Sequence, residues 1–172
     1  MQNRRTKGAS YGHHVGDEPQ NAASEMIRAV YPMFGRLADA TPGDLQETHE
    51  LFAEGFLRED RRRFITVPTV GVKGLFESFQ AYWDLGVGAP TFTVAEVHAV
   101  RGDRLLLFRG RAEFAEGQAT ESLVLVAYSA EMRAARAVLF DLDDLDGALD
   151  ELERLHAGIE ADGGSPPVDA HP

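Results

Sequence analysis

The spacing of hydrophobic residues changes near Pro90, from a period near 3.6 to a period of two. In the first half, Ile27, Val30 and Phe34 recur at helical spacing, and Asn21 or Ser24 can cap a helix in front of them. After Pro90, apolar and polar residues alternate as they do in half-buried strands. The pattern therefore predicts helices first and strands afterwards.

Three helices and one short strand are predicted before Pro90. Pro32 predicts a kink or restart of the first helix near residues 31–33, because proline removes a backbone donor. A second helix is expected after residues 41–44, and a short strand over 64–70. A third helix, over 73–85, is aromatic. The apolar face of the second helix would contain Leu45, His49, Phe52 and Phe56, and the third helix carries Phe76, Phe79, Tyr82 and Trp83.

Four strands are predicted over residues 91–100, 105–114, 120–129 and 133–140, joined by short turns. An acidic turn over 141–144 follows, and Leu145, Leu149 and Leu152 then recur with helical spacing. Short connections favour antiparallel neighbours, and a twisted sheet of this size curls. The expected fold class is α+β: a cone-shaped, curved antiparallel sheet with the N-terminal helices on its concave side and a C-terminal helix.

One domain is expected over residues 21–158, since 172 residues with 44% hydrophobic content suffice for a single core. Residues 1–20 and 159–172 are polar and rich in glycine or proline, which predicts flexible tails. A net charge of −11, with 28 acids against 17 bases, argues against nucleic acid as a partner. The chain has no cysteine, apolar membrane span or signal peptide, so a soluble, cytoplasmic protein without membrane contact is expected.

Three segments resemble the SnoaL-like, polyketide cyclase type of the nuclear transport factor 2-like and ketosteroid isomerase-like superfamily. They are E-D-R-R-R-F at 59–64, E-S-L-V-L-V-A-Y at 121–128 and F-D-L-D-D-L-D-G-A-L-D-E-L at 140–152. The resemblance extends over residues 22–158 and implies a cone fold with a pocket, a homodimer formed through the outer sheet face, and chemistry without a cofactor. It also implies a hydrophobic, polyketide-like or terpenoid-like substrate.

The chain departs from this subgroup at two positions. The subgroup has a motif of an acid, a histidine and an arginine, which corresponds to Asp60, Arg61 and Arg62 in this chain. Arg61 therefore stands where the subgroup has histidine. An arginine stays protonated and cannot act as a base. The acid that such cyclases carry in the last strand is also absent from residues 135–139.

Three residues are candidates for catalysis. Asp60 beside Arg62 could orient a carbonyl or abstract a proton, or it could face water in a surface turn. His49 would point inward from the second helix, either as a proton carrier or as a structural group. His98 shares a strand face with Glu96, and this face is either the concave or the convex one; the neighbouring Phe92 and Val94 favour the concave one.

The predicted substrate-binding residues are Tyr31 and Tyr82 as hydroxyl donors, Phe79 and Trp83 as apolar walls, Arg62, and Glu121, whose sheet face the sequence leaves open. Arg109, Arg111 and Glu113 are expected on the outer face. The aspartates over 141–146 suit a helix N-terminus better than a metal, and no metal or cofactor is expected. Two functions remain: an isomerase, cyclase, dehydratase or epoxide hydrolase, or a non-catalytic module that binds a ligand or dimerises.

Overall fold

The computed structural model describes residues 18–39, 47–63, 69–84, 90–114 and 117–161. Its elements are α1 (Ala22–Val30), η1 (Tyr31–Asp39), β1 (Phe52–Asp60), α3 (Val72–Asp84), β2 (Thr91–Arg101), β3 (Leu105–Glu113), β4 (Ala119–Tyr128), β5 (Ala134–Phe140) and α4 (Leu145–Ala161). Most of the predicted N-terminal tail and most of the predicted C-terminal tail lie outside the described residues. No helix in the described part is long and apolar enough to cross a membrane.

The first helix begins where the sequence places a capping residue. The Ser24 amide donates to Asn21 Oδ1 at 2.8 Å, and the Asn21 amide donates to Ser24 Oγ at 2.9 Å, which forms a capping box. Asn21 also donates from Nδ2 to the carbonyl of Leu105 at 3.1 Å, which ties α1 to β3. The α-helix ends at Val30 and the chain continues as the 3-10 helix η1, so the predicted restart near Pro32 is confirmed.

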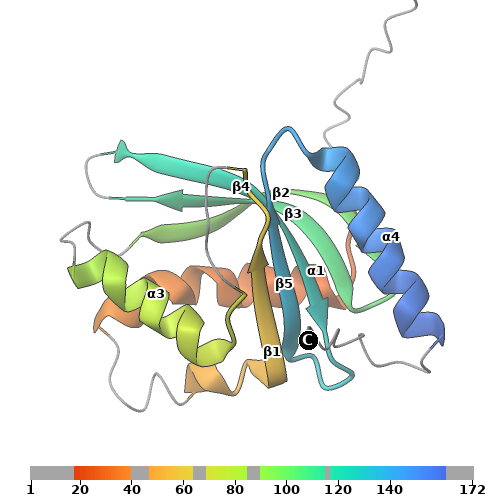
Figure 1. Ribbon diagram of the computed structural model, residues 1–172, viewed down its shortest axis with the longest axis horizontal. Helices are drawn as coiled ribbons and strands as arrows, with labels where there is room; N and C mark the ends of the chain where they lie inside the picture. Colours follow the sequence, from red (N-terminus) through yellow and green to blue (C-terminus); the bar gives the residue numbers. More distant parts are fainter. Residues whose placement is uncertain (1–17, 40–46, 64–68, 85–89, 115–116, 162–172) are drawn as a thin grey trace, which may run out of the picture.

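The sheet has five strands in the order β1-β5-β4-β3-β2 (Figure 1). Strands β2 to β5 form the predicted antiparallel meander, and β1 pairs with β5 in parallel. The α+β fold class is confirmed: one curved sheet carries α1, η1 and α3 on the side that we call the inner face. Helix α4 covers the other side, the outer face.

The predicted second helix is wrong over residues 52–57, because residues 52–60 form strand β1. Phe52 and Phe56 are both buried on the inner face, and a spacing of four fits a helix face as well as one side of a strand. Gly55, with a φ of +79°, and the register shift between Phe52 and Leu57 mark a bulge in this strand. Of the strand expected over 64–70, residues 64–68 lie outside the described residues, and Val70 forms an antiparallel bridge with Arg58.

The predicted third and terminal helices are confirmed as α3 and α4. Helix α4 continues three residues past the expected domain end at 158, and Ile159 is buried there. It packs on the outer face through Ala148, Leu152, Leu155 and Ile159, against the side chains of Leu105, Leu107, Leu123, Leu125, Val138 and Phe140. This packing fills the outer face, whereas the inner face encloses a cavity.

Candidate functional site

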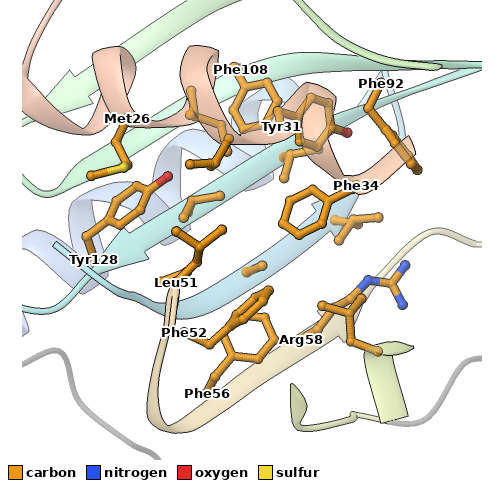
Figure 2. Close-up of a pocket in the computed structure, with 18 of the residues that line it drawn as sticks. Met26, Tyr31, Phe34, Leu51, Phe52, Phe56, Arg58, Phe92, Phe108 and Tyr128 are labelled. Carbon is orange, nitrogen blue, oxygen red and sulfur yellow. The ribbon is translucent and has the colours of Figure 1, made fainter. Parts of the chain in front are cut away.

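A cavity of about 180 Å³ lies between the inner face and the helices α1, η1 and α3 (Figure 2). All five strands contribute residues to the wall of this cavity, and so do α1, η1 and α3. Eight aromatic residues line it: Tyr31, Phe34, Phe52, Phe56, Phe79, Phe92, Phe108 and Tyr128. A concave, mostly apolar space with a few polar groups is the usual form of a small-molecule site.

The aromatic wall is organised around Phe34, which η1 places over the cavity. Its ring stacks on Phe79 with centroids 6.0 Å apart, and contacts Phe52 and Tyr31 at 6.0 and 6.2 Å. Phe92 from β2 also meets Phe79 edge to face at 5.8 Å. These offset and edge contacts are the favourable geometries for aromatic rings, so the wall is fixed before any ligand enters.

The apolar lining of the cavity includes one carboxylate among the described residues, that of Asp60. Alternate residues of a strand share one face, so Arg58 and Asp60 both point inward, and Arg62 follows them. Arg62 donates from Nε to Asp60 Oδ1 at 2.8 Å and from Nη2 to Oδ2 at 2.6 Å. The side chain of Asp60 is 0% exposed, against 17% for Arg58 and 18% for Arg62. We call these three residues the inner cluster.

Four donors surround the Asp60 carboxylate. Besides the two bonds from the Arg62 side chain, the Arg62 amide approaches Oδ1 at 3.3 Å and Arg58 Nη2 approaches Oδ2 at 3.4 Å. A carboxylate offers about four lone-pair positions, so the ground state leaves none of them without a donor. The contact from Arg58 is the longest of the four and is the one that a substrate oxygen would most easily displace.

Tyr31 supplies a hydroxyl to the same cavity. Burial raises its pKa to about 12, while the nearby charges of Arg58 and Arg62 act in the opposite direction. The phenol is therefore neutral at physiological pH and can donate a hydrogen bond. The Tyr31 hydroxyl packs against Gly110 of β3. Only glycine fits at this position, because an added Cβ would lie 2.6 Å from Tyr31 Oη.

Tyr128, at the end of β4, is a cavity residue that the sequence reasoning missed. It is 2% exposed, and its Oη is buried without a hydrogen-bond partner among the described residues. Burial alone raises its pKa. A buried hydroxyl without a partner costs about 1–3 kcal/mol. The signal available in the sequence was its place on the strand, since Val124, Val126 and Tyr128 alternate on the inner face.

Four of the predicted site residues line the cavity: Tyr31, Asp60, Arg62 and Phe79. Their placement agrees with the prediction, and their roles stay predictions. Tyr82 and Trp83 belong to α3, but their side chains lie outside the described residues.

His49 does not line the cavity, and the expectation that it points inward is wrong. The residue is exposed and stacks on Phe76 with ring centroids 4.7 Å apart and an interplanar angle of 9°. The expectation placed His49 and Phe52 on one helix face, whereas the chain turns over residues 50–51 and Phe52 opens β1. The two side chains therefore do not share a face.

His98 and Glu121 also lie away from the cavity. His98 Nδ1 is 3.9 Å from Glu96 Oε1, and Glu96 in turn meets Arg109 on the outer face at 3.6 Å. The neighbours Phe92 and Val94 suggested the inner face, but register shifts between Val94 and Glu96 and between Val97 and Ala99 rotate the strand. The pair is therefore close together, but on the wrong side to meet a ligand.

Glu121 accepts from Arg111 at 3.1 Å, and Arg111 also contacts Glu113 at 3.3 Å. Arg111 and Glu113 thus lie on the outer face, as predicted, and Glu121, whose face the sequence left open, joins them there. A homodimer through this face stays a prediction. Within the described ranges, no group of three His, Asp or Glu residues could hold a metal ion.

No protein-family model matches the chain, and no curated protein matches it. PrhC from Penicillium brasilianum is similar in structure, with a TM-score of 0.51, 14% identity, and coverage of 84% of this chain and 99% of that chain. A protein from Agrobacterium tumefaciens whose description assigns it to the SnoaL-like family has a TM-score of 0.47 and 15% identity over 67% of this chain and 97% of its own.

SalBIII is described as an epoxide hydrolase/cyclase-like enzyme with a role in pyran ring formation in polyether salinomycin. It has a TM-score of 0.47 and 13% identity, over 69% of this chain and 92% of its own. Similarity at these levels of identity concerns the fold alone. The similarity to PrhC is therefore one of fold, and proteins described as nuclear transport factor 2-like and SnoaL-like are among the structures that the comparison finds.

Proposed function

We propose that this chain, with its nuclear transport factor 2-like cone, is a cofactor-independent enzyme that acts on a small hydrophobic molecule held in the cavity. The reaction class is proton transfer next to a carbonyl or opening of an epoxide, as isomerases, cyclases, dehydratases and epoxide hydrolases carry out. A polyketide-like or terpenoid-like substrate would suit the aromatic wall.

The observation that carries this proposal is the inner cluster. Among the described lining residues Asp60 is the only carboxylate, and its side chain has no exposure to solvent. Excluding water strengthens every electrostatic interaction at this point. An arginine pair around one carboxylate gives both a proton acceptor and positive charge for a developing oxyanion.

A sequence of steps follows from the distances. A substrate carbonyl oxygen accepts from Arg58, which draws the guanidinium from its 3.4 Å contact and frees one lone pair of Asp60 Oδ2, while Arg62 still donates to that oxygen at 2.6 Å. Oδ2 then takes the proton from the α-carbon, and the electrons of the broken C–H bond move onto the carbonyl oxygen as an enolate. Arg58 stabilises that negative charge. Where the α-carbon adjoins a C=C bond, the enolate is a dienolate, and return of the proton from Asp60 to the far carbon of that bond completes an isomerisation without any cofactor.

Deuterium exchange tests this proposal directly. A panel of apolar aryl ketones is incubated with the protein in D₂O, and mass spectrometry follows deuterium uptake at the α-carbon. We expect uptake with the wild type and a loss of about 100-fold or more in Asp60→Asn, which keeps the size and removes the base. Glu59→Gln, on the same strand but the opposite face, is the matched control and should exchange like the wild type.

A non-catalytic binding module is the second candidate, because the Asp60 carboxylate is already saturated by four donors. In such a module the inner cluster would only recognise a polar group. Binding of the ketones by the wild type without deuterium uptake would favour this second function. Absence of both binding and uptake would overturn both functions.

A further inference from the structure

Tyr128 and the inner cluster lie at opposite ends of the cavity. Tyr128 pairs with Ala134, and Ala134 pairs with Phe52 at the start of β1. Asp60, at the other end of β1, pairs with Leu139. Five residues along β5 separate these two levels, which is about 16 Å at the rise of a strand. The side chains reach inward from both levels, so their polar atoms are closer than this.

The described residues around Tyr128 Oη offer it no hydrogen-bond partner. Its ring packs in an apolar cluster with Ile27, Val126 and Met26. Figure 2 shows the hydroxyl turned into the cavity, across from Arg58. The hydroxyl can donate one hydrogen bond and accept others, yet it makes none with the described residues. Polar groups with this degree of burial are normally satisfied, so the partner is expected to arrive with the ligand.

The end of the cavity that contains the inner cluster is charged, whereas the end at Tyr128 is apolar. Arg58 and Arg62 carry two positive charges against the single negative charge of Asp60, so the inner cluster is positive by one unit. An anionic or strongly polarised oxygen is favoured there. The seven other aromatic residues that line the cavity favour a flat, apolar body.

We propose that Tyr128 is a specificity residue, and that the ligand is an elongated apolar molecule with a polar group at each end. A carboxylate or carbonyl oxygen meets Arg58 and Arg62, and a hydroxyl or keto group meets the Tyr128 hydroxyl. This rests on the proposed function only in requiring that the cavity binds a small molecule; it does not require catalysis.

Two rigid probes that differ by one hydroxyl test the proposal. They are 4′-hydroxybiphenyl-4-carboxylate and biphenyl-4-carboxylate, titrated by calorimetry. The wild type should bind the hydroxylated probe about fivefold to tenfold more tightly, as one hydrogen bond to an otherwise unsatisfied buried group predicts. In Tyr128→Phe this preference should vanish, while the unliganded variant melts no lower than the wild type because it loses no protein hydrogen bond.

Arg62→Gln is the complementary variant. It should weaken both probes by a similar factor and keep the preference for the hydroxylated one, which fixes the orientation of the probes. Equal binding of the two probes by the wild type, or a preference that survives in Tyr128→Phe, would overturn the role of Tyr128 and leave the proposed function standing. Failure of the wild type to bind either probe would overturn both.

Discussion

Strand β1 supplies two clusters of arginine and carboxylate, one on each face of the sheet. Arg58, Asp60 and Arg62 form the inner cluster. Their neighbours belong to the outer cluster, which is made of Glu59, Arg61, Arg136, Glu151 and Arg154. The residue types are the same, and a period of two along one strand separates them.

The outer cluster is partly buried where β1, β5 and α4 meet. Glu151 of α4 is 7% exposed, accepts from Arg154 at 2.8 Å, and lies 3.6 Å from Arg136 of β5, whose side chain is 9% exposed. Arg61 lies over the ring of Phe140 at 5.6 Å. This cluster joins β1, β5 and α4, and its neighbours are the leucines under α4.

The comparison teaches that charge pairing alone does not distinguish a structural cluster from a functional one. Both clusters hold partly buried arginines on carboxylates. What differs is the space beside them: a filled core at the outer cluster, and a cavity of about 180 Å³ at the inner one. The inner cluster can therefore meet a ligand, whereas the outer cluster can only hold the fold together.

The largest expected effect is on the outer cluster. Glu151→Ala leaves Arg136 buried with less negative charge around it, and should lower the free energy of unfolding by about 3–5 kcal/mol. Urea denaturation measures this loss. Affinity for the biphenyl probes should not change, with the exposed Glu160→Ala on the same helix as control. A folded Glu151→Ala protein that no longer binds the probes would contradict the division between the two clusters.

A smaller effect is expected on the inner face from Gly110→Ala. The new Cβ would lie 2.6 Å from Tyr31 Oη and 3.2 Å from Val124 Cγ2, so the tyrosine has to move into the cavity. The variant should lose about 1–3 kcal/mol of stability and bind both probes more weakly. Calorimetry and urea denaturation together test this. Unchanged probe affinity would show that Tyr31 does not shape the binding space.

The smallest effect is the response of the outer cluster to acid. The hydrogen bond from Arg61 lowers the pKa of Glu59 below its ordinary 4.5. Its stabilising contribution is therefore present above about pH 4.5 and is lost as the pH falls through the lower folded pKa. Glu59→Gln should show a shallower loss of stability between pH 5 and pH 3 than the wild type, and Glu160→Gln should not. Identical slopes for Glu59→Gln and the wild type would mean that the Arg61 bond contributes nothing.

The elements that the sequence predicted correctly are those with local causes. The meander from β2 to β5 follows from alternation and short turns, and α4 follows from leucine spacing after an acidic turn. Strand β1 was missed because Phe52 and Phe56 fit either period, and because its partner, β5, lies about 80 residues away in the chain. Only the folded sheet reveals such a pairing.

The candidate site was predicted in part for the same reason. Asp60 and Arg62 came from a sequence motif, which does not depend on knowing the element that carries them. His49 depended on the wrong helix, and the side of His98 depended on two register shifts that alternation cannot show. Tyr128 could not be recognised as a site residue from the sequence, because its distinguishing feature is a buried hydroxyl without a hydrogen-bond partner among the described residues. Only the folded structure shows this feature.

The parallel pairing of β1 with β5 also affects the order of folding. Closing a loop of this length costs more entropy than forming the adjacent turns of the meander, so β1 should add to the sheet after β2 to β5 have formed. It lies at the sheet edge and has a bulge at Gly55, which both favour local opening. Each opening of β1 would take Arg58 and Asp60 away from the cavity while the leucine core under α4 stays closed. We therefore expect the polar end of the cavity to assemble late, and the amide protons of β1 to exchange earlier than those of the central strands β3, β4 and β5.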